Sequence, residues 1–220
     1  MHPLNSSVTI IFDCDGVIFD SNNLKVDAMG TVLRSLNFSS SQIESCLNFF
    51  SKNFGKSRYF HVDVFLEKYL AIKDEQKDYF REKILNAYSV ECRHLYTVAK
   101  IAPFLLEFLA KNKAVKFIAS GSEQEELRQV IKERGLNHYF DGVFGSPTKK
   151  VDLVADIISK SGNEGCILIG DSHSDLEAAR TNHIDFIYYS PYSNVDSIMR
   201  KLCKQFDYKI LSSFQEVVDK

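Results

Sequence analysis

The stretch of sequence that decides the fold is residues 9–17, Thr-Ile-Ile-Phe-Asp-Cys-Asp-Gly-Val. Its apolar half shows no alternation of polar and apolar residues, which is typical of a strand buried on both faces of a parallel sheet. Asp13, Asp15 and Gly16 follow where this strand ends, and open α/β sheets bind ligands beyond the carboxyl ends of their strands. Two carboxylates in this position could supply a nucleophile, a proton donor and metal-binding oxygens, although Asp and Gly are also common in plain turns.

Similar short strands recur farther along the chain and alternate with helical segments. One helix is expected to begin at Ser122, with Glu125 completing a capping box and Gly135 at its end, and another at Ser174 with Glu177. This alternation predicts a doubly wound α/β fold with a parallel sheet. The expected strands are 9–13, 115–119, 142–144, 166–169, 186–189 and, with a weaker pattern, 208–211.

Residues 20 to about 100 interrupt this alternation, because they contain helical patterns and no convincing strand. Examples are the segments 64–70 and 79–85. A single strand, a long helical stretch and then four or five strand–helix units predict a helical insertion after the first strand.

A second acidic segment, Gly-Asp-Ser-His-Ser-Asp at 170–175, follows another buried strand. Asp171 and Asp175 are therefore expected at the same sheet edge as Asp13 and Asp15, where four acidic groups would repel one another unless a cation neutralised them. Oxygen ligands without a cluster of His or Cys favour Mg²⁺ over zinc. The alternative for Asp175 is a simple helix cap.

Groups that could bind an anion follow two further strands. Ser120 and Gly121 end the strand at 115–119, and a hydroxyl with free backbone N–H groups before a helix can bind an anion. Lys149 and Lys150 follow Gly-Ser-Pro-Thr at 145–148, ahead of a helix expected over 151–160. One of these lysines is a candidate phosphate ligand, although a surface lysine pair is usually only solvated charge.

Composition excludes several classes of protein. The chain has 220 residues, 45% of them hydrophobic, and 27 basic against 29 acidic side chains give a net charge of −2. This balance is typical of a globular protein and argues against nucleic acid as a partner. The first apolar run is too short for a secretory signal or a membrane span, and five cysteines without a Cys-x-x-Cys pair favour a reducing cytoplasm.

The ordered set of motifs resembles the haloacid dehalogenase superfamily. These motifs are D-x-D-G-V at Asp13, A-S-G-S ending at Ser122, a lysine after G-S-P, and G-D-S-x-x-D at Gly170. The resemblance implies a Rossmann-like catalytic core formed by residues 1–19 and 100–220. It also implies that residues 20–99 form a mobile, all-helical cap domain.

The same resemblance implies a role for each acidic residue. Asp13 would be the nucleophile that forms an aspartyl-phosphate, and Asp15 would act first as acid and then as base, for which its pKa should be raised. Mg²⁺ would be bound by the Asp13 carboxylate, the Asp15 backbone carbonyl and the Asp171 carboxylate. Asp175 would not bind the metal directly but would orient the lysine or the metal-bound water.

The phosphate and the substrate would be bound by other groups. The resemblance implies that Ser120, the Gly121 amide and Lys150 bind the phosphoryl oxygens, with Lys149 left as the alternative lysine. In the cap, Lys56 or Arg58 is expected to meet a polar or anionic part of the substrate, although their loop could also be purely structural. No role is assigned to an oligomeric partner, to nucleic acid or to a membrane.

The function implied is therefore that of a cytoplasmic, Mg²⁺-dependent phosphomonoester hydrolase. Its substrate would be a small phosphorylated metabolite such as a sugar phosphate. A phosphomutase that returns the phosphoryl group to a bound intermediate is one alternative. A non-catalytic binding module on the same fold is the other.

Overall fold

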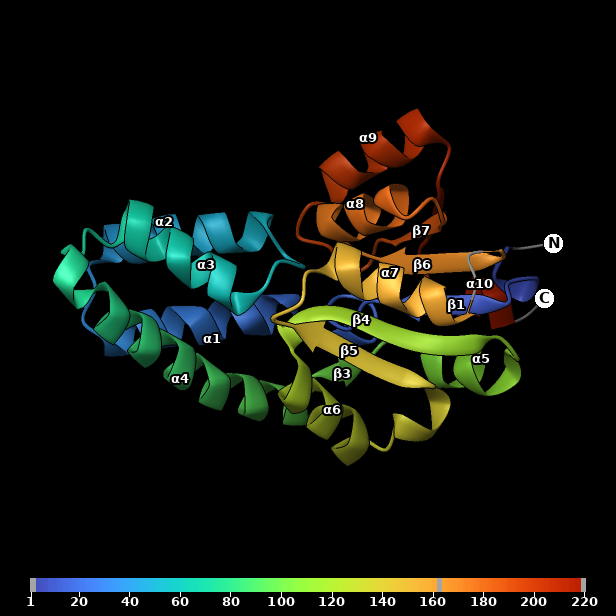
Figure 1. The fold of residues 1–220 in the computed structure, drawn as a ribbon, viewed down its shortest axis with the longest axis horizontal. Helices are drawn as coiled ribbons and strands as arrows, with labels where there is room; N and C mark the ends of the chain where they lie inside the picture. Colours follow the sequence, from blue (N-terminus) through green and yellow to red (C-terminus); the bar gives the residue numbers. More distant parts are fainter. Residues whose placement is uncertain (1–2, 162–163, 219–220) are drawn as a thin grey trace.

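The computed structural model describes residues 3–161 and 164–218 (Figure 1). It contains one sheet of parallel strands with helices on both faces, and a group of helices that extends away from that sheet. The strands of the sheet are β1 Thr9–Phe12, β4 Val115–Glu123, β5 Gly142–Ser146, β6 Cys166–Gly170, β7 Asp185–Tyr189 and β8 Lys209–Leu211. The helices beside it are α5 Leu105–Lys111, α6 Gln124–Glu133, α7 Lys150–Ser161, α8 His173–Thr181, α9 Asp196–Phe206 and α10 Gln215–Val218.

The strand order is β5-β4-β1-β6-β7-β8, and every neighbouring pair in this sheet is parallel. Side chains of β1 alternate between the two faces: Ile10 and Phe12 pack in one apolar core and Ile11 in the other. Helices α5, α6 and α10 cover the first face, and α7, α8 and α9 cover the second. The predicted Rossmann-like, doubly wound sheet is confirmed.

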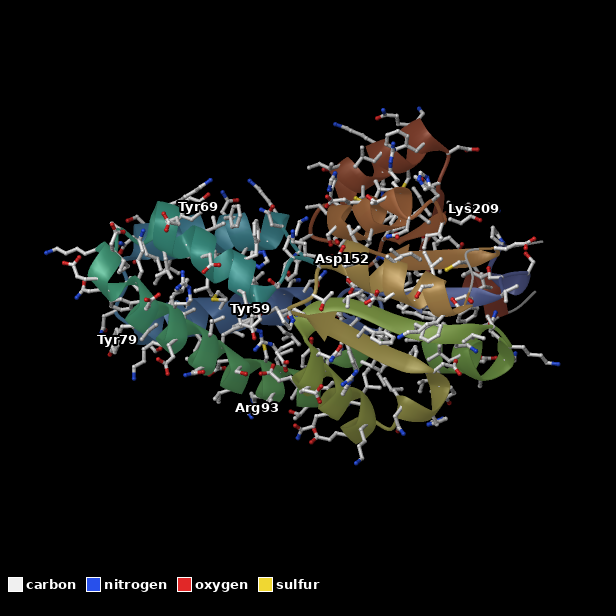
Figure 2. The ribbon with its side chains drawn as sticks, viewed as in Figure 1. Tyr59, Tyr69, Tyr79, Arg93, Asp152 and Lys209 are labelled. Carbon is white, nitrogen blue, oxygen red and sulfur yellow. The ribbon has the colours of Figure 1, made fainter. Side chains whose placement is uncertain are left out.

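The helical group lies to one side of the sheet in Figure 1 and is built from residues between β1 and β4. A pair of two-residue strands, β2 Phe19–Asp20 and β3 Lys100–Ile101, runs antiparallel where the chain leaves and re-enters the sheet region. Tyr69 and Tyr79 mark the far part of this group in Figure 2. Its members are α1 Asn22–Ser35, α2 Ser40–Lys52, α3 Arg58–Val64, the π-helical turn Phe65–Tyr69 and α4 Asp74–Val98. Short 3₁₀ turns at Pro3–Asn5 and Asn137–Tyr139 complete the fold.

The prediction of Ser122 as the N-cap of the helix after β4 is wrong by one residue, because the N-cap is Glu123. β4 continues through Glu123, and the carboxylate of Glu123 caps α6 by accepting a hydrogen bond from the backbone N–H of Glu126. The sequence-based interpretation failed because Ser122 turns its hydroxyl into the sheet edge instead. The predicted end is confirmed, since Gly135 follows α6 with a φ of +69°.

The predicted capping box of α8 is also displaced. Ser172, not Ser174, precedes the helix, and Asp175 rather than Glu177 completes the box. The Asp175 carboxylate accepts bonds from both the backbone N–H and the hydroxyl of Ser172. Separately, no helix within the described ranges is long and apolar enough to cross a lipid bilayer.

Candidate active site

The candidate site lies where the strand order of the sheet reverses. The chain passes from β1 to β4 and β5 on one side and later to β6, β7 and β8 on the other. Open α/β sheets bind ligands at such a switch point, beyond the carboxyl ends of the strands. Asp13 follows β1 and Asp171 follows the adjacent β6 directly. These two carboxylates therefore reach the same place because of the register of the sheet.

Three carboxylates come together at this point. Ligand oxygens of Asp13, Asp171 and Asp175 all lie within 4.8 Å of one another, and each residue is at most 2% exposed. Gly170 makes this approach possible, because a Cβ there would lie 2.2 Å from the Cβ of Asp175. The predicted acidic cluster is thus present as a compact group of buried oxygen atoms.

Lys150, the first residue of α7, is the cation inside this cluster. Its Nζ lies 2.9 Å from Asp13 Oδ1 and 2.5 Å from Asp175 Oδ1. Burial alone would lower the pKa of Lys150, but the two carboxylates raise it, so the amine stays charged. Lys149 is exposed, so of the two candidate lysines the structure brings only Lys150 into the cluster.

The cluster retains an excess of negative charge. Burial raises the pKa of Asp13 to about 7, because Lys150 offsets only part of the desolvation. Burial and the neighbouring carboxylates raise the pKa of Asp171 well above its usual value. Asp171 Oδ1 has no hydrogen-bond partner among the described residues. A cation bound by carboxylate oxygens fits this environment, and an all-oxygen donor set suits Mg²⁺.

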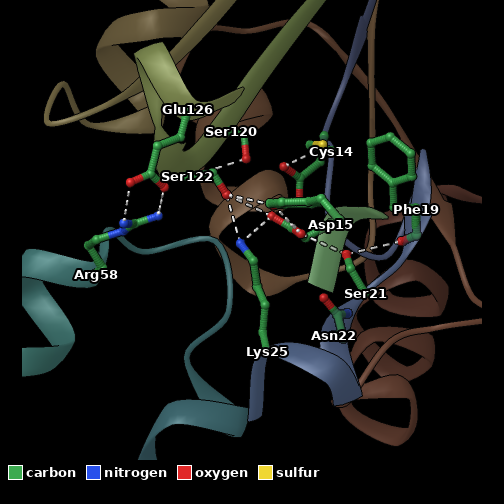
Figure 3. A network of polar contacts seen from close by, with 12 residues as sticks. Cys14, Asp15, Phe19, Ser21, Asn22, Lys25, Arg58, Ser120, Ser122 and Glu126 are labelled. Carbon is green, nitrogen blue, oxygen red and sulfur yellow. Dashed lines mark hydrogen bonds and ion pairs between the residues drawn. The ribbon is translucent and has the colours of Figure 1, made fainter. Parts of the chain in front are cut away.

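Asp15 has very different neighbours, which Figure 3 shows from close by. Lys25 Nζ lies 2.5 Å from its Oδ2, and the Ser122 hydroxyl donates to the same oxygen at 2.8 Å. The hydroxyls of Ser21 and Tyr96 donate to Oδ1 at 2.6 Å and 2.7 Å. Each carboxylate oxygen of Asp15 therefore accepts hydrogen bonds from two donors.

These donors favour the charged form of Asp15, which contradicts the raised pKa expected from the sequence. Burial would raise its pKa, but Lys25 and the hydroxyl donors outweigh burial and lower the pKa below its usual value. In this arrangement Asp15 is a carboxylate ion paired with an ammonium group, not the raised-pKa acid that the sequence predicted.

Ser120 and Gly121 lie at the end of β4 and line the same pocket as Asp13 and Asp15. Ser120 is buried, and its Oγ accepts a bond from the backbone N–H of Ser122. At Gly121 a Cβ would lie 2.5 Å from the carbonyl oxygen of Gly55. Only glycine therefore allows the loop before α3 to approach β4 so closely.

Side chains of the helical group close the pocket from the other side. The cavity that remains beside the two aspartates is about 30 Å³, which has room for only a few water molecules. It is lined by Asp13, Asp15, Lys25, Phe50, Phe54, Gly55, Lys56, Arg58, His61, Tyr88, Ser120, Gly121 and Ser122. A wider cavity of about 470 Å³ shares Gly55, Lys56 and Gly121 with this pocket and is also lined by Lys150.

The two candidate substrate residues of the helical group are both paired with acids from helices of the sheet region. Arg58 makes a two-pronged contact with Glu126 at 3.1 Å and 2.7 Å and lies over the ring of Tyr88. Lys56 Nζ lies 2.9 Å from Glu177 Oε2 at a half-exposed position. In this structure both side chains bridge the two parts of the chain.

The sequence reasoning missed five residues that surround the aspartates. Four contact Asp15, and the amide of Asn22 contacts Asp171. One signal was available, since Ser21, Asn22 and Lys25 follow the D-x-D-G loop closely, and residues four apart share one helix face. Tyr96 and Ser122 carry no comparable signal. The five are Ser21, Asn22, Lys25, Tyr96 and Ser122.

Comparison with known proteins places this geometry in a family. Residues 10–189 match a family model described as haloacid dehalogenase-like hydrolase. No curated protein sequence matches the chain.

Solved structures share the fold at low sequence identity. A predicted phosphatase from Clostridium acetobutylicum is 18% identical, with 97% of each chain covered and a TM-score of 0.75. A predicted phosphoglycolate phosphatase from Haemophilus somnus is 14% identical, again with 97% of each chain covered and a TM-score of 0.74. CbbY from Rhodobacter sphaeroides, solved in complex with phosphate, is 16% identical, with 96% of each chain covered and a TM-score of 0.72.

Proposed function

The chain belongs to the haloacid dehalogenase-like hydrolases, and from this we propose that it is a Mg²⁺-dependent phosphatase of small phosphorylated metabolites. The observation that carries the proposal is the cluster of Asp13, Asp171 and Asp175, whose negative charge Lys150 only partly offsets. Solved structures described as phosphatases share the fold and support the reaction class.

Asp13 is proposed as the nucleophile. Its Oδ1 accepts hydrogen bonds from the backbone N–H of Cys14 at 2.8 Å and lies 2.9 Å from Lys150, so the side chain is held in one orientation. In the first step a carboxylate oxygen of Asp13 bonds to phosphorus, and the bond between phosphorus and the leaving oxygen breaks. Lys150, Ser120 and the Gly121 amide offset the charge on the phosphoryl oxygens.

The bound Mg²⁺ would supply the remaining positive charge that lets an anionic phosphate approach an anionic nucleophile. Asp13 and Asp171 would bind it through their carboxylates and Asp15 through its backbone carbonyl. Asp175 would keep Lys150 in place.

Asp15 is proposed as the acid–base group together with Lys25. Lys25 Nζ lies 2.5 Å from Asp15 Oδ2, and in the first step a proton passes from Lys25 through Asp15 to the leaving oxygen. In the second step Asp15 accepts a proton from water as the water oxygen bonds to phosphorus, and passes it back to Lys25. The bond from phosphorus to Asp13 then breaks, which releases inorganic phosphate and restores the carboxylate.

Residues 20–99 are proposed as a cap domain that opens for each substrate molecule. The cavity beside Asp13 and Asp15 is narrow, at about 30 Å³, and the β2–β3 pair is the place where the chain enters and leaves this domain. Opening would separate Arg58 from Glu126 and Lys56 from Glu177. Either cation would then be free to bind an anionic part of the substrate as the cap closes.

We place the enzyme in the cytoplasm, because its five cysteines are buried with free thiols, which suits a reducing compartment. We expect its partner to be a small phosphorylated metabolite.

The proposal is tested with a panel of phosphorylated metabolites assayed for phosphate release, with Mg²⁺ and with a chelator. Asp13→Asn should abolish release, and Asp27→Asn, at an exposed position of α1, is the matched control. Activity that survives Asp13→Asn would contradict the covalent mechanism. Isomerisation of a sugar phosphate in the presence of its bisphosphate, without phosphate release, would identify a phosphomutase instead. Binding without turnover by the wild type would identify a non-catalytic module.

A further inference from the structure

We propose that Asn22 is a positioning residue for the cation site, because its side-chain amide fixes the carboxylate of Asp171. The inference rests on the proposed Mg²⁺-dependent function and assigns to it a residue outside the acidic motifs. Asn22 is the first residue of α1 and is 1% exposed. Its Nδ2 lies 2.6 Å from Asp171 Oδ2 and 3.0 Å from the backbone oxygen of Tyr192.

These two contacts determine the orientation of the amide. An amide nitrogen carries two N–H donors, and here each donor has an acceptor. A flipped side chain would instead place Asn22 Oδ1 against the Asp171 carboxylate and the Tyr192 carbonyl, which are both acceptors. Asn22 therefore presents its donors to Asp171, and Asp171 Oδ2 is held in one place.

The contact leaves two oxygen atoms without partners. Asp171 Oδ1 and Asn22 Oδ1 are both buried and have no hydrogen-bond partner in the part of the chain that the structure describes. A buried carboxylate oxygen without a donor is costly unless a cation is nearby. Because Oδ2 is tied to Asn22, Oδ1 is the oxygen of Asp171 that remains available as a ligand. Metal-binding carboxylates are commonly oriented by such hydrogen bonds from neighbouring groups.

Gly16 provides the space for this contact. Its φ is +81°, and a Cβ at this position would lie 2.4 Å from Asp171 Oδ2 and 2.5 Å from Asn22 Nδ2. The Ser193 hydroxyl also donates to the backbone oxygen of Asp171 at 2.6 Å, so the loop after β7 holds both partners. The glycine of the D-x-D-G motif therefore permits Asn22 and Asp171 to meet.

A purely structural role is the alternative, in which Asn22 only anchors the start of α1. The two roles differ in what a substitution changes. A structural anchor affects the melting temperature and leaves metal affinity unchanged. A positioning residue changes metal affinity even in a protein that remains folded.

The test is direct binding of Mn²⁺, a spectroscopic substitute for Mg²⁺, measured by electron paramagnetic resonance on the full chain. Asn22→Ala should weaken Mn²⁺ binding by about tenfold or more, the usual effect of losing such an orienting contact. Asn23→Ala, at the exposed neighbouring position, should bind Mn²⁺ like the wild type. Unchanged affinity in folded Asn22→Ala would overturn the inference.

Two further measurements keep the result interpretable. The Mg²⁺ concentration that gives half-maximal phosphatase activity should rise in Asn22→Ala, and excess Mg²⁺ should restore much of the turnover. If Asn22→Ala does not fold, Asn22→Ser carries the same test, because its shorter hydroxyl also loses the amide contact. A wild type that binds no Mn²⁺ would remove the proposed cation site itself. If the wild type binds Mn²⁺ and Asn22→Ala binds it equally well, the cation site stands and only the proposed role of Asn22 is overturned.

Discussion

Asp13 and Asp15 lie two residues apart, yet their surroundings are opposite. Asp15 accepts hydrogen bonds from three hydroxyls and an ammonium group, and its pKa falls. Asp13 shares one lysine with Asp175 and lies beside Asp171, and its pKa rises to about 7. The protein thus neutralises one aspartate with its own side chains and leaves the other short of positive charge. This contrast supports the proposal that a cation binds beside Asp13 and not beside the Asp15 side chain.

Removing Lys150 should have the largest effect, because Lys150 supplies the ammonium group that contacts both Asp13 and Asp175. Lys150→Ala leaves Asp13 and Asp175 buried without their ammonium partner. We expect kcat to fall by about 100- to 1,000-fold and the free energy of unfolding to fall by about 3–5 kcal/mol. Steady-state kinetics and urea unfolding measure both effects. Lys149→Ala is the matched control, and an equal loss of kcat in both variants would contradict a single phosphate-binding lysine.

Lys25→Met removes the cation that neutralises Asp15, which leaves Asp15, like Asp13, buried and short of positive charge. The pKa of Asp15 should rise, because burial is then opposed only by the hydroxyl donors. If Asp15 must be ionised to accept a proton from water, the acidic limb of the pH–rate profile should move to higher pH. We expect kcat to fall by about 10- to 100-fold. A profile that keeps its shape would show that Lys25 does not set the ionisation of Asp15.

The stability of the metal-free protein should depend on pH in the direction that Asp13 dictates. Its pKa is raised from 3.8 to about 7 on folding, so the folded state binds a proton more tightly than the unfolded state. This contribution to stability is present below about pH 4 and is lost as pH rises toward 7 and above. The melting temperature in a chelator should therefore fall between pH 5 and pH 8, measured by circular dichroism.

Mg²⁺ should reduce that fall, because the cation replaces the proton as the neutralising charge. At 100 times its Kd, Mg²⁺ would add about 2.7 kcal/mol to the free energy of unfolding. Asp171→Asn is the variant in which this stabilisation should be smallest. A melting temperature at pH 8 that Mg²⁺ leaves unchanged would argue against the cation site.

Arg58→Ala should have the smallest effect, because Arg58 pairs with Glu126 and with neither aspartate. If Arg58 binds the substrate after it separates from Glu126, KM for the best substrate should rise by about tenfold, with kcat little changed. Glu126→Gln, which frees Arg58 without removing it, should lower KM or leave it unchanged. An unaltered KM in Arg58→Ala would leave this residue as a structural link between cap and core.

The sequence predicted the residues whose positions follow directly from strand ends. Asp13 and Asp171 could be placed together because adjacent parallel strands end at the same sheet edge. Lys150 and Ser120 were placed by the same argument: in the structure Ser120 lines the pocket beside Asp13, and Lys150 contacts Asp13.

What the sequence could not predict depends on how the helical insertion packs. Lys25 and Tyr96 come from the two ends of that insertion, and only tertiary packing brings both to Asp15. The expected pKa of Asp15 was wrong for this reason, since a cation from α1 outweighs the burial. The start of α6 was misplaced because the Ser122 hydroxyl bonds to Asp15 in preference to capping the helix.

The short β2–β3 pair has a consequence for how motion and chemistry are linked. The backbone N–H of Gly16 donates to the oxygen of Phe19 at 2.8 Å, and that of Ala102 donates to the oxygen of Ile18 at 2.9 Å. The segments that connect the helical group to the sheet are therefore hydrogen-bonded to the loop that carries Asp13 and Asp15. If the helical group moves as the proposed cap, that movement would displace the loop that carries Asp13 and Asp15, so admission of a substrate would be coupled to the position of the proposed acid–base pair.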